Sequence, residues 1–444
     1  LSLHDALPIF ILYNKIKNTK KGILMKFSKI EKSWILYDVG NSAFVMLVST
    51  IIPIYFKNIA SSAGVSMADS TAYFGYATSI STLIVAILGP ILGTIGDTSG
   101  YRKRLFLLSL GVGAVGCVAL GIPMGWLLFL VMFVVAKIGY NGSLIFCDSM
   151  LTDVTTDDRM DEVSSVGYAF GYIGSCIPFA ACMLLVLFSG SIGISTQLAT
   201  SISFVITAVW WVLMTVPLLR GYRQKFSVGH VSNPVKEGFV RLGHTIKNIR
   251  QDKNIVLFLV AFFFYIDGVY TIIEMATSYG KDVGVGDNDL LMALLLTQIV
   301  AFPFALLFGW LSKRVKTEKL IYVGIIGYFF IALFAIQLDR AWEFWFLAVC
   351  VAIFQGGIQA LSRSYFAKII PKEKSAEYFG FYDIFGKGAA FTGTLLVSVV
   401  TQLTGHSRYG IISISFLFVI GFVLFVMAVR RINHEKNSGT HAGL

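Results

Sequence analysis

The chain reads Gly93-Thr-Ile-Gly-Asp97-Thr-Ser-Gly100-Tyr-Arg102-Lys103-Arg104 between two long apolar stretches, 71–95 and 105–126. Each stretch is long enough to cross a bilayer as a helix, which takes about 20 residues. The residues between them are too few for a domain and are rich in glycine and in basic side chains. The stretch therefore predicts a tight turn between two membrane-spanning helices.

The composition indicates an integral membrane protein. Hydrophobic residues make up 56% of the chain and charged residues 14%, whereas soluble domains carry about 25% charged residues. The mean hydropathy is +0.75. The net charge of +11 does not point to nucleic acid, because the bases lie in short loops between apolar segments rather than along one polar face.

The residue types that bind metals and cofactors form no recognisable pattern. The five cysteines lie inside apolar segments and include no Cys-x-x-Cys pair, and the six histidines lie in expected loops or tails. We therefore expect no disulfide framework and no metal site. No Walker loop is present, and we expect no cofactor.

Twelve apolar segments follow one another along the chain, at 34–57, 70–95, 105–124, 126–152, 163–189, 196–219, 254–279, 290–312, 319–338, 342–366, 377–402 and 408–429. The polar stretch 220–253 divides them into two sets of six. We therefore predict an all-α integral membrane fold of twelve transmembrane helices in two six-helix bundles, 34–219 and 254–431. The remaining parts are an N-terminal segment, 1–33, and a tail, 432–444.

Two further expectations concern the ends and the direction of the chain. Residues 1–24 differ in character from the rest and are left out of the fold prediction, with Met25 as the expected native start. With a cytoplasmic N-terminus, 30 of the 36 Lys and Arg residues lie on the inner side, four on the outer side and two inside spans. The positive-inside rule then places both termini in the cytoplasm, and we expect a bacterial plasma membrane.

The linker between the two sets has its own pattern. Apolar residues recur at helical spacing among bases, at Val235, Phe239, Leu242, Ile246 and Ile249. This pattern predicts a basic amphipathic helix that lies on the inner membrane surface. It is either a tether between the halves or a lipid sensor.

The loop has a second copy, Gly309-Trp-Leu-Ser-Lys313-Arg314-Val-Lys316-Thr-Glu-Lys319, which follows 216 residues later. In this copy Lys313 and Lys316 replace the acid and the second glycine. Matching halves of six spans are typical of transporters built from parallel repeats, whose substrate site lies near the midplane.

The first loop, Gly93-x3-Asp97-x2-Gly100-x-Arg102-Lys103-Arg104, resembles the loop motif of the major facilitator superfamily. It departs from that motif at Thr98 and Tyr101, where the family commonly has bases. Three other stretches are similar to the vacuole-effluxer branch, which is related to autophagy-linked amino-acid exporters: Trp34-Ile-Leu-Tyr37-Asp38-Val-Gly-Asn41-Ser42-Ala43, Gly356-Gly357-Ile-Gln359-Ala-Leu-Ser362-Arg363-Ser364-Tyr365-Phe366 and Phe379-Gly380-Phe-Tyr382-Asp383-Ile-Phe-Gly386-Lys387. The resemblance covers about residues 32–431 and implies an amino-acid cargo by analogy.

The chemistry of the loop motif favours a contact between helices. Gly93 and Gly100 permit a close helix approach and a tight turn. Asp97 is placed to accept hydrogen bonds from a neighbouring helix N-terminus, or from Arg102 and Arg104. Such a contact stabilises one conformation; the alternative is a topology signal with an incidental acid.

Two ionisable groups lie near the middle of predicted spans, where charge is costly without a partner, a wet cavity or a function. Lys137 is in the fourth span and Asp267 in the seventh. The resemblance implies that the first, fourth, seventh and tenth spans line a central cavity. A cation from one half and an anion from the other suit a zwitterion such as an amino acid. Alternatively, the two form a structural ion pair.

Further polar residues extend these two positions into stripes, with Asn141 one turn from Lys137 and with Thr271 and Glu274 after Asp267. Stripes favour a cavity over a single satisfied contact. A buried carboxyl group holds its proton more readily than a solvated one. Asp267, Glu274 and Asp38 are therefore candidate proton carriers.

The remaining candidates have competing structural explanations. Asp383 and Lys387, at i and i+4, predict a structural ion pair along one helix. Asp38 and Asp148 lie near inner span ends, where a gate would close; for Asp38 the alternative is a first-turn carboxylate favoured by the helix dipole. Interhelical hydrogen bonds or substrate binding account for the buried glutamines, Gln298, Gln355 and Gln359. Arg363 is either a gate residue or a base that reaches lipid headgroups.

We predict a secondary transporter that moves a small solute by alternating access between its halves. Proton coupling is preferred, and amino acids are the expected cargo. The alternatives are an exporter of amphipathic drugs or lipids and, less favoured, an integral membrane enzyme. We expect membrane lipid and a small-molecule substrate as partners, no nucleic acid, and a monomer.

Overall fold

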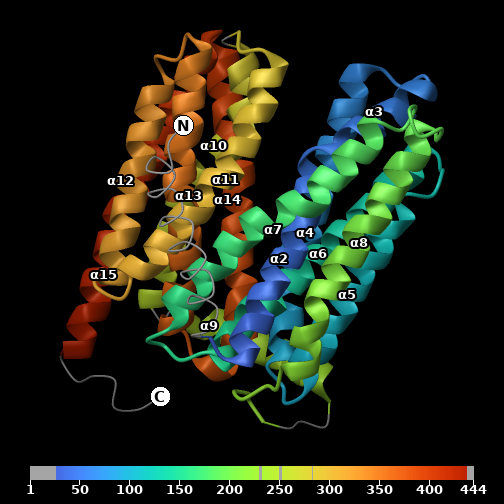
Figure 1. Ribbon diagram of the computed structural model, residues 1–444. Coiled ribbons are helices and arrows are strands. Elements are labelled where there is room, and N and C mark those ends of the chain that lie inside the picture. Colours follow the sequence, from blue (N-terminus) through green and yellow to red (C-terminus); the bar gives the residue numbers. More distant parts are fainter. Residues whose placement is uncertain (1–26, 230–232, 250–252, 283, 438–444) are drawn as a thin grey trace, which may run out of the picture.

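The computed structural model describes residues 27–229, 233–249, 253–282 and 284–437. Within these residues all regular elements are helices, and they form two bundles (Figure 1). The first bundle consists of α2 (Lys29–Ser49), α3 (Ile51–Ser62), α4 (Met67–Gly96), α5 (Tyr101–Ala119), α6 (Trp126–Val154), α7 (Met160–Leu187) and α8 (Thr196–Gly221).

The second bundle consists of α10 (Lys253–Asp282), α11 (Asp287–Leu311), α12 (Thr317–Ala335), α13 (Ala341–Ile369), the short 3-10 helix η1 (Lys372–Lys374), α14 (Ser375–Thr404) and α15 (Ser407–Asn437). Between the bundles runs α9 (Pro234–Ile249). The predicted all-α membrane fold of two bundles is confirmed.

Eleven helical segments in the described ranges are long and apolar enough to cross a membrane, with α2 and α3 counted as one. The third predicted span, 105–124, corresponds to α5, which is not among the eleven. Its first turn carries Arg102, Lys103 and Arg104, so its apolar run is shorter than that of the other segments. With α5, each bundle has six spanning segments.

The first span is broken into α2 and α3 at Thr50, whose φ of −128° and ψ of −71° are not helical. Pro53 accounts for the position of the break, because a proline ring clashes with the carbonyl group four residues earlier, here that of Ser49. The Thr50 hydroxyl donates to Met46 O at 2.5 Å, a contact that often accompanies helix bends. The chain thus turns partway along a predicted continuous helix.

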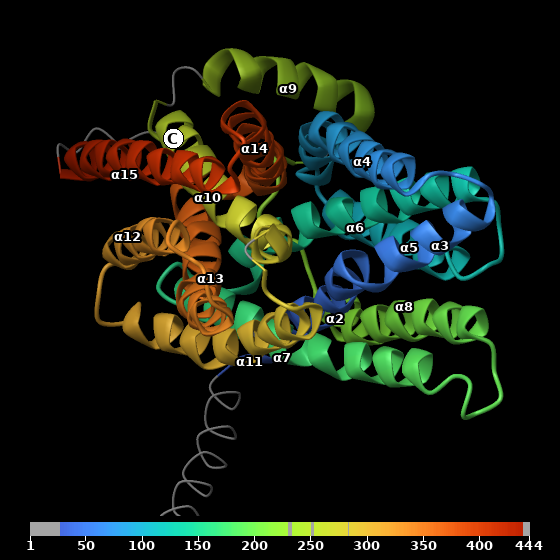
Figure 2. The same ribbon diagram turned by 90° about the horizontal axis from the view of Figure 1, so that it is seen from above.

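The bundles meet along two seams (Figure 2). One seam joins α4 to α14, and the other joins α7 to α11 and α13. The first seam depends on paired glycines, since a Cβ atom on Gly380 would lie 2.7 Å from the Gly89 carbonyl carbon. Helices that approach this closely need small residues at the contact.

The predicted linker helix is present as α9, which contacts α4 (Figures 1 and 2). Arg241 donates to Thr98 Oγ1 at 2.8 Å and to Thr94 O at 3.3 Å, while Phe239 is exposed. The side chains of three residues in the predicted apolar pattern, Val235, Ile246 and Ile249, lie outside the described part of the chain. We call the end of the molecule that carries α9 the α9 end, and the opposite end the α3 end.

Candidate functional site

Arg363 of α13 lies inside the first bundle, toward the α9 end. Its Nη2 atom is 3.0 Å from Asp38 Oδ2 and its Nη1 atom is 3.0 Å from Asp148 Oδ1. Its Nε donates to Ser164 Oγ at 2.9 Å. Only 3% of Arg363 is exposed. One side chain of the second bundle thus contacts α2, α6 and α7 of the first.

This arrangement decides two alternatives that the sequence left open. Arg363 does not reach toward lipid headgroups, because its guanidinium is enclosed by protein. Asp38 is not a first-turn residue, because α2 begins nine residues earlier, at Lys29. Both residues instead join the two bundles.

Two aromatic rings cover the faces of the guanidinium. The Arg363 guanidinium carbon lies 4.6 Å from the Trp34 ring centroid and 4.5 Å from that of Tyr168. The Trp34 indole is held in place, since its Nε1 donates to Cys147 O at 2.8 Å. Asp38 can occupy its position beside Arg363 because residue 167 is glycine: a Cβ atom there would lie 2.3 Å from Asp38 Oδ2.

We call Trp34, Asp38, Asp148, Ser164 and Tyr168 the Arg363 site. All five belong to the first bundle, and Arg363 is the group from the second bundle that fills the site. The sequence predicted Asp38, Asp148 and Arg363 but neither ring.

The first loop joins the bundles through Asp97. Its Oδ1 and Oδ2 accept the backbone N–H groups of Ala376 and Glu377 in the first turn of α14, each at 2.9 Å. Oδ1 also lies 2.6 Å from Arg102 Nη2, and both side chains are fully buried. Burial raises the pKa of Asp97 to about 7, against the opposing effect of Arg102 and the two amides. Both kinds of partner that the motif predicts are present; Arg104, the third base, lies over the Tyr101 ring instead.

Arg102 extends this contact to the start of the linker. Its Nη1 is 2.7 Å from Asp153 Oδ2, and Asp153 also accepts from the Tyr222 hydroxyl and, at 3.0 Å each, from the amides of Lys225 and Phe226. The sequence did not single out Asp153, because an acid at a predicted span end has an ordinary solvated explanation.

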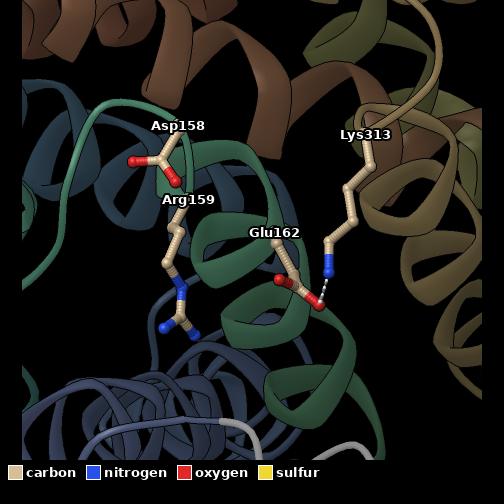
Figure 3. Close-up of a pocket in the computed structure, with 4 residues that line it drawn as sticks. All are labelled: Asp158, Arg159, Glu162 and Lys313. Atoms are coloured by element: carbon tan, nitrogen blue, oxygen red, sulfur yellow. Dashed lines mark ion pairs between the residues drawn. The ribbon is translucent and has the colours of Figure 1, made fainter.

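The second loop contacts the first turns of α7. Lys313 Nζ lies 2.7 Å from Glu162 Oε1, and both side chains are partly exposed. Figure 3 shows the two pointing toward one another, with Asp158 and Arg159 to the side of the pair. These four residues line an open pocket of about 430 Å³. Gly309 packs here as Gly93 does at α14, since a Cβ atom on Gly309 would lie 2.8 Å from Ser165 Cβ.

A further contact lies nearby on the same seam. Asp161 accepts from Lys368 Nζ at 2.5 Å, from Ser364 Oγ at 2.6 Å and from Thr317 Oγ1 at 2.6 Å. The bundles are therefore joined at the α9 end by several independent polar contacts.

Toward the α3 end, Lys137 interacts electrostatically with Glu274 and Lys387. Lys137 belongs to α6, whereas the other two belong to α10 and α14 of the second bundle. Lys137 is half-buried and Glu274 is exposed. Within the described part of the chain, Lys137 forms no ion pair. Opposite charges from the two bundles thus act on one another without direct contact.

Asp267 is not the group that interacts with Lys137, which corrects the predicted pairing and excludes a direct ion pair between them. Asp267 is fully buried and its Oδ1 accepts from Thr271 Oγ1 at 3.2 Å. A Cβ atom on Gly393 would lie 2.0 Å from Asp267 Oδ1. The packing of α14 at this glycine encloses Asp267 inside its own bundle, and Glu274 takes its place.

The other predicted residues lie at various depths. Asp383 and Lys387 form an ion pair along α14. Asn141 is buried, and its Nδ2 has no partner in the described residues. Gln355 is buried, whereas Gln298 and Gln359 are half-buried. The described residues contain no group of three or more side chains that could bind a metal ion.

Sequence reasoning missed a set of tyrosines that belongs to this region. Four of them, from both bundles, lie near enough to Asp148 to feel its charge, and the fifth, Tyr172, lies near Asp38; the four are Tyr140, Tyr168, Tyr270 and Tyr382. Tyrosine is common in membrane helices, so its position alone gave no signal.

Comparison with known proteins places this chain in a family. A family model described as "Vacuole effluxer Atg22 like" matches residues 28–437. The chain is 46% identical over 407 residues to the MFS-type transporter YxiO of Bacillus subtilis, covering 90% of this chain and 95% of YxiO. It is 24% identical over 491 residues to autophagy-related protein 22 of Saccharomyces cerevisiae, covering 90% of each.

Solved structures show the same fold at low sequence identity. The transporter FucP in the outward conformation superposes with a TM-score of 0.71 at 14% identity, covering 91% of this chain and 99% of FucP. A bacterial homologue of the iron transporter ferroportin, in an outward-facing state, gives 0.66 at 14% identity, with 90% and 99% covered. FucP is a transporter of the major facilitator superfamily, so the chain has the fold of that superfamily.

Proposed function

Because the chain belongs to the Atg22-like vacuole effluxer family and is an MFS-type transporter of the membrane, we propose that it carries amino acids by alternating access. The observation that carries this proposal is the pair of opposite charges, Lys137 and Glu274, which come from different bundles and act on one another without an ion pair. A zwitterion placed between them satisfies both, with its carboxylate at Lys137 and its ammonium at Glu274.

Neighbouring groups supply the rest of the substrate site. Asn141 lies one turn from Lys137 and carries a buried amide nitrogen without a partner in the described residues. Gln298, Gln355 and Gln359 add amide groups from the second bundle. Thr271, a further predicted residue, is instead enclosed with Asp267 at Gly393. Polar groups of this kind fix the orientation of a small ligand in a site.

Alternating access requires that the α9 end open and close while the site stays in place. Its closed state is supported by the contacts of Arg363, Asp97, Asp161 and Lys313 described above. We assign the α9 end to the cytoplasm, because the basic loops gather there, and the membrane to the bacterial plasma membrane. Each monomer then carries a complete site, surrounded by lipid.

We assign proton coupling to Asp267. It is fully buried, its Oδ2 has no partner in the described residues, and it interacts electrostatically with Glu274. Glu274 connects this carboxyl group to the substrate site. Asp38 is less suited, because it already pairs with Arg363.

Purified protein in liposomes tests the proposal with radiolabelled amino acids, a cationic dye and a lysolipid. We expect amino-acid uptake that falls at least about tenfold in Lys137→Ala and in Glu274→Gln, since a lost hydrogen bond to a charged group costs about 1.5–3 kcal/mol. Asp267→Ala should abolish uptake driven by a proton gradient but leave exchange. Lys319→Ala, at an exposed base of the α9 end, is the matched control.

Two outcomes contradict the proposal. Uptake that is unchanged in both Lys137→Ala and Glu274→Gln would contradict the proposed substrate site. Transport of the dye or the lysolipid without any amino acid would contradict the proposed amino-acid cargo.

A further inference from the structure

The Arg363 site is a complete receptor for a flat cation, built by the first bundle alone. It offers two carboxylates, from Asp38 and Asp148, and one hydroxyl, from Ser164. The Trp34 and Tyr168 rings lie within 4.6 Å of the guanidinium carbon, one from α2 and one from α7. Stacking on aromatic faces together with forked hydrogen bonds is what a guanidinium prefers.

The group that fills this receptor belongs to the other bundle. When the bundles separate at the α9 end, Arg363 moves away with α13, and Asp38 and Asp148 lose the guanidinium that neutralises them. Two neighbouring carboxylates without a cation repel one another. The open site therefore favours a new cation, from solution or from the central site.

We propose that this cation is the side chain of a basic amino acid, and that Arg363 is its internal stand-in. This inference rests on the proposed function and names its preferred substrate class: amino acids with a guanidinium or ammonium side chain. The aromatic faces favour an organic cation over a proton or a small metal ion, neither of which gains from two flanking rings in this way.

The position of Asp148 connects the two sites. Its side chain is 20% exposed, whereas that of Arg363 is 4% exposed, and its carboxylate interacts electrostatically with Asp383 of α14. Along α6, Asp148 lies eleven residues from Lys137, about 16 Å at 1.5 Å per residue. Asp148 therefore lies on the α9 side of Lys137, along the same helix.

The test compares L-arginine with L-citrulline, which has nearly the same shape but no charge, and with L-leucine. In liposomes with the full chain, we expect the transport efficiency for arginine to exceed that for citrulline at least tenfold. Tyr168→Leu should reduce this ratio severalfold, whereas Tyr168→Phe, which keeps the ring, should retain it. In nanodiscs, Arg363→Gln should raise the ratio of arginine to leucine affinity at least tenfold, whereas Lys313→Gln, which loosens the same end, should leave this ratio near that of the parent.

Lys313→Gln is the control, because it loosens the same end without emptying the receptor. Equal transport of arginine and citrulline, with leucine also carried, overturns this inference but leaves the proposed function intact. Absence of all amino-acid transport overturns the proposed function itself. Loss of leucine binding would reveal that Arg363→Gln does not fold. In that case the ratio of arginine to citrulline transport efficiency, in the wild type and in the Tyr168 variants, still tests the inference. The inference is also overturned if Arg363→Gln changes only how binding depends on pH or sodium and does not change the affinity for arginine.

Discussion

The two copies of the loop hold the same end of the molecule with opposite charges. In the first copy an acid, Asp97, accepts the first-turn amides of α14. In the second copy a base, Lys313, stands 216 residues later and pairs with Glu162 in the first turn of α7. In the sequence, Lys313 indicates that the second copy has lost the motif. In the structure, Lys313 joins the two bundles as Asp97 does.

The difference lies in where the negative charge sits. A helix N-terminus favours a negative charge near its free amides. For α14 that charge comes from the loop, and for α7 it comes from the helix itself, through Glu162, so the loop supplies the base. The first contact is fully buried and the second is partly exposed. We therefore infer that the first contact is the stronger one.

The largest expected effect comes from Asp97→Asn. The substitution keeps the shape but replaces one acceptor oxygen by an NH₂ group, so one buried amide at the start of α14 loses its partner, which costs about 2–3 kcal/mol. Arg102 keeps its pair with Asp153. We expect transport to fall at least tenfold and the thermal unfolding midpoint to drop. Lys313→Gln, the matched change in the second copy, should cost about 1 kcal/mol or less because that pair is partly exposed. Equal losses in the two variants would contradict the comparison.

A smaller effect is expected from alanine at the two equivalent glycines. At Gly93 a Cβ atom would lie 2.3 Å from the Ala376 carbonyl oxygen, so α14 itself must move. At Gly309 the obstacle is the Ser165 side chain. Overpacking of this kind costs about 1–3 kcal/mol.

Ser165→Gly separates the two cases. It should restore the thermal stability and transport of Gly309→Ala. It should not restore those of Gly93→Ala, where the obstacle is backbone. Rescue of both, or of neither, would show that the two glycines do not act through the contacts described.

Acidification should favour the closed state through the first contact only. The pKa of Asp97 is raised to about 7 in the closed state, chiefly by burial, whereas an open, solvated Asp97 keeps an ordinary, lower pKa. The proton therefore binds the closed state more tightly, and lowering the pH from 8 to 6 should shift the population toward closure. We expect the long-distance population between two spin labels on different bundles to shrink as the pH falls. Asp97→Asn should remove this dependence; if the dependence persists, another group causes it.

The smallest effect is expected from exchanging the charges of the second contact. Glu162→Lys and Lys313→Glu should each weaken it, and the double variant should recover about 0.2–1 kcal/mol, the range of exposed pairs. A double-mutant cycle on the thermal unfolding midpoint measures this coupling. A coupling near zero would mean that the contact does not contribute to the closed state.

The sequence predicted the helices well because membrane spans are set by apolar length. It predicted both partners of Asp97 from the chemistry of the loop. It did not predict that Glu274 would replace Asp267 as the group facing Lys137. The two acids are seven residues apart and share a helix face to within about 20°, and only the packing of α14 at Gly393 buries one of them. The rings around Arg363 were missed because aromatic residues in membrane helices have an ordinary packing explanation.

The central claim is that the first loop contact holds the α9 end closed more strongly than the second. Electron spin resonance distances between labels at Arg104→Cys and Lys319→Cys, two exposed positions on different bundles, measure this directly. The part-exposed Cys176 and Cys350 are replaced by serine. We predict one short distance for the parent, a large longer population in Asp97→Asn and a small one in Lys313→Gln. An Asp97→Asn distribution identical to the parent, or a larger opening in Lys313→Gln, would contradict the claim.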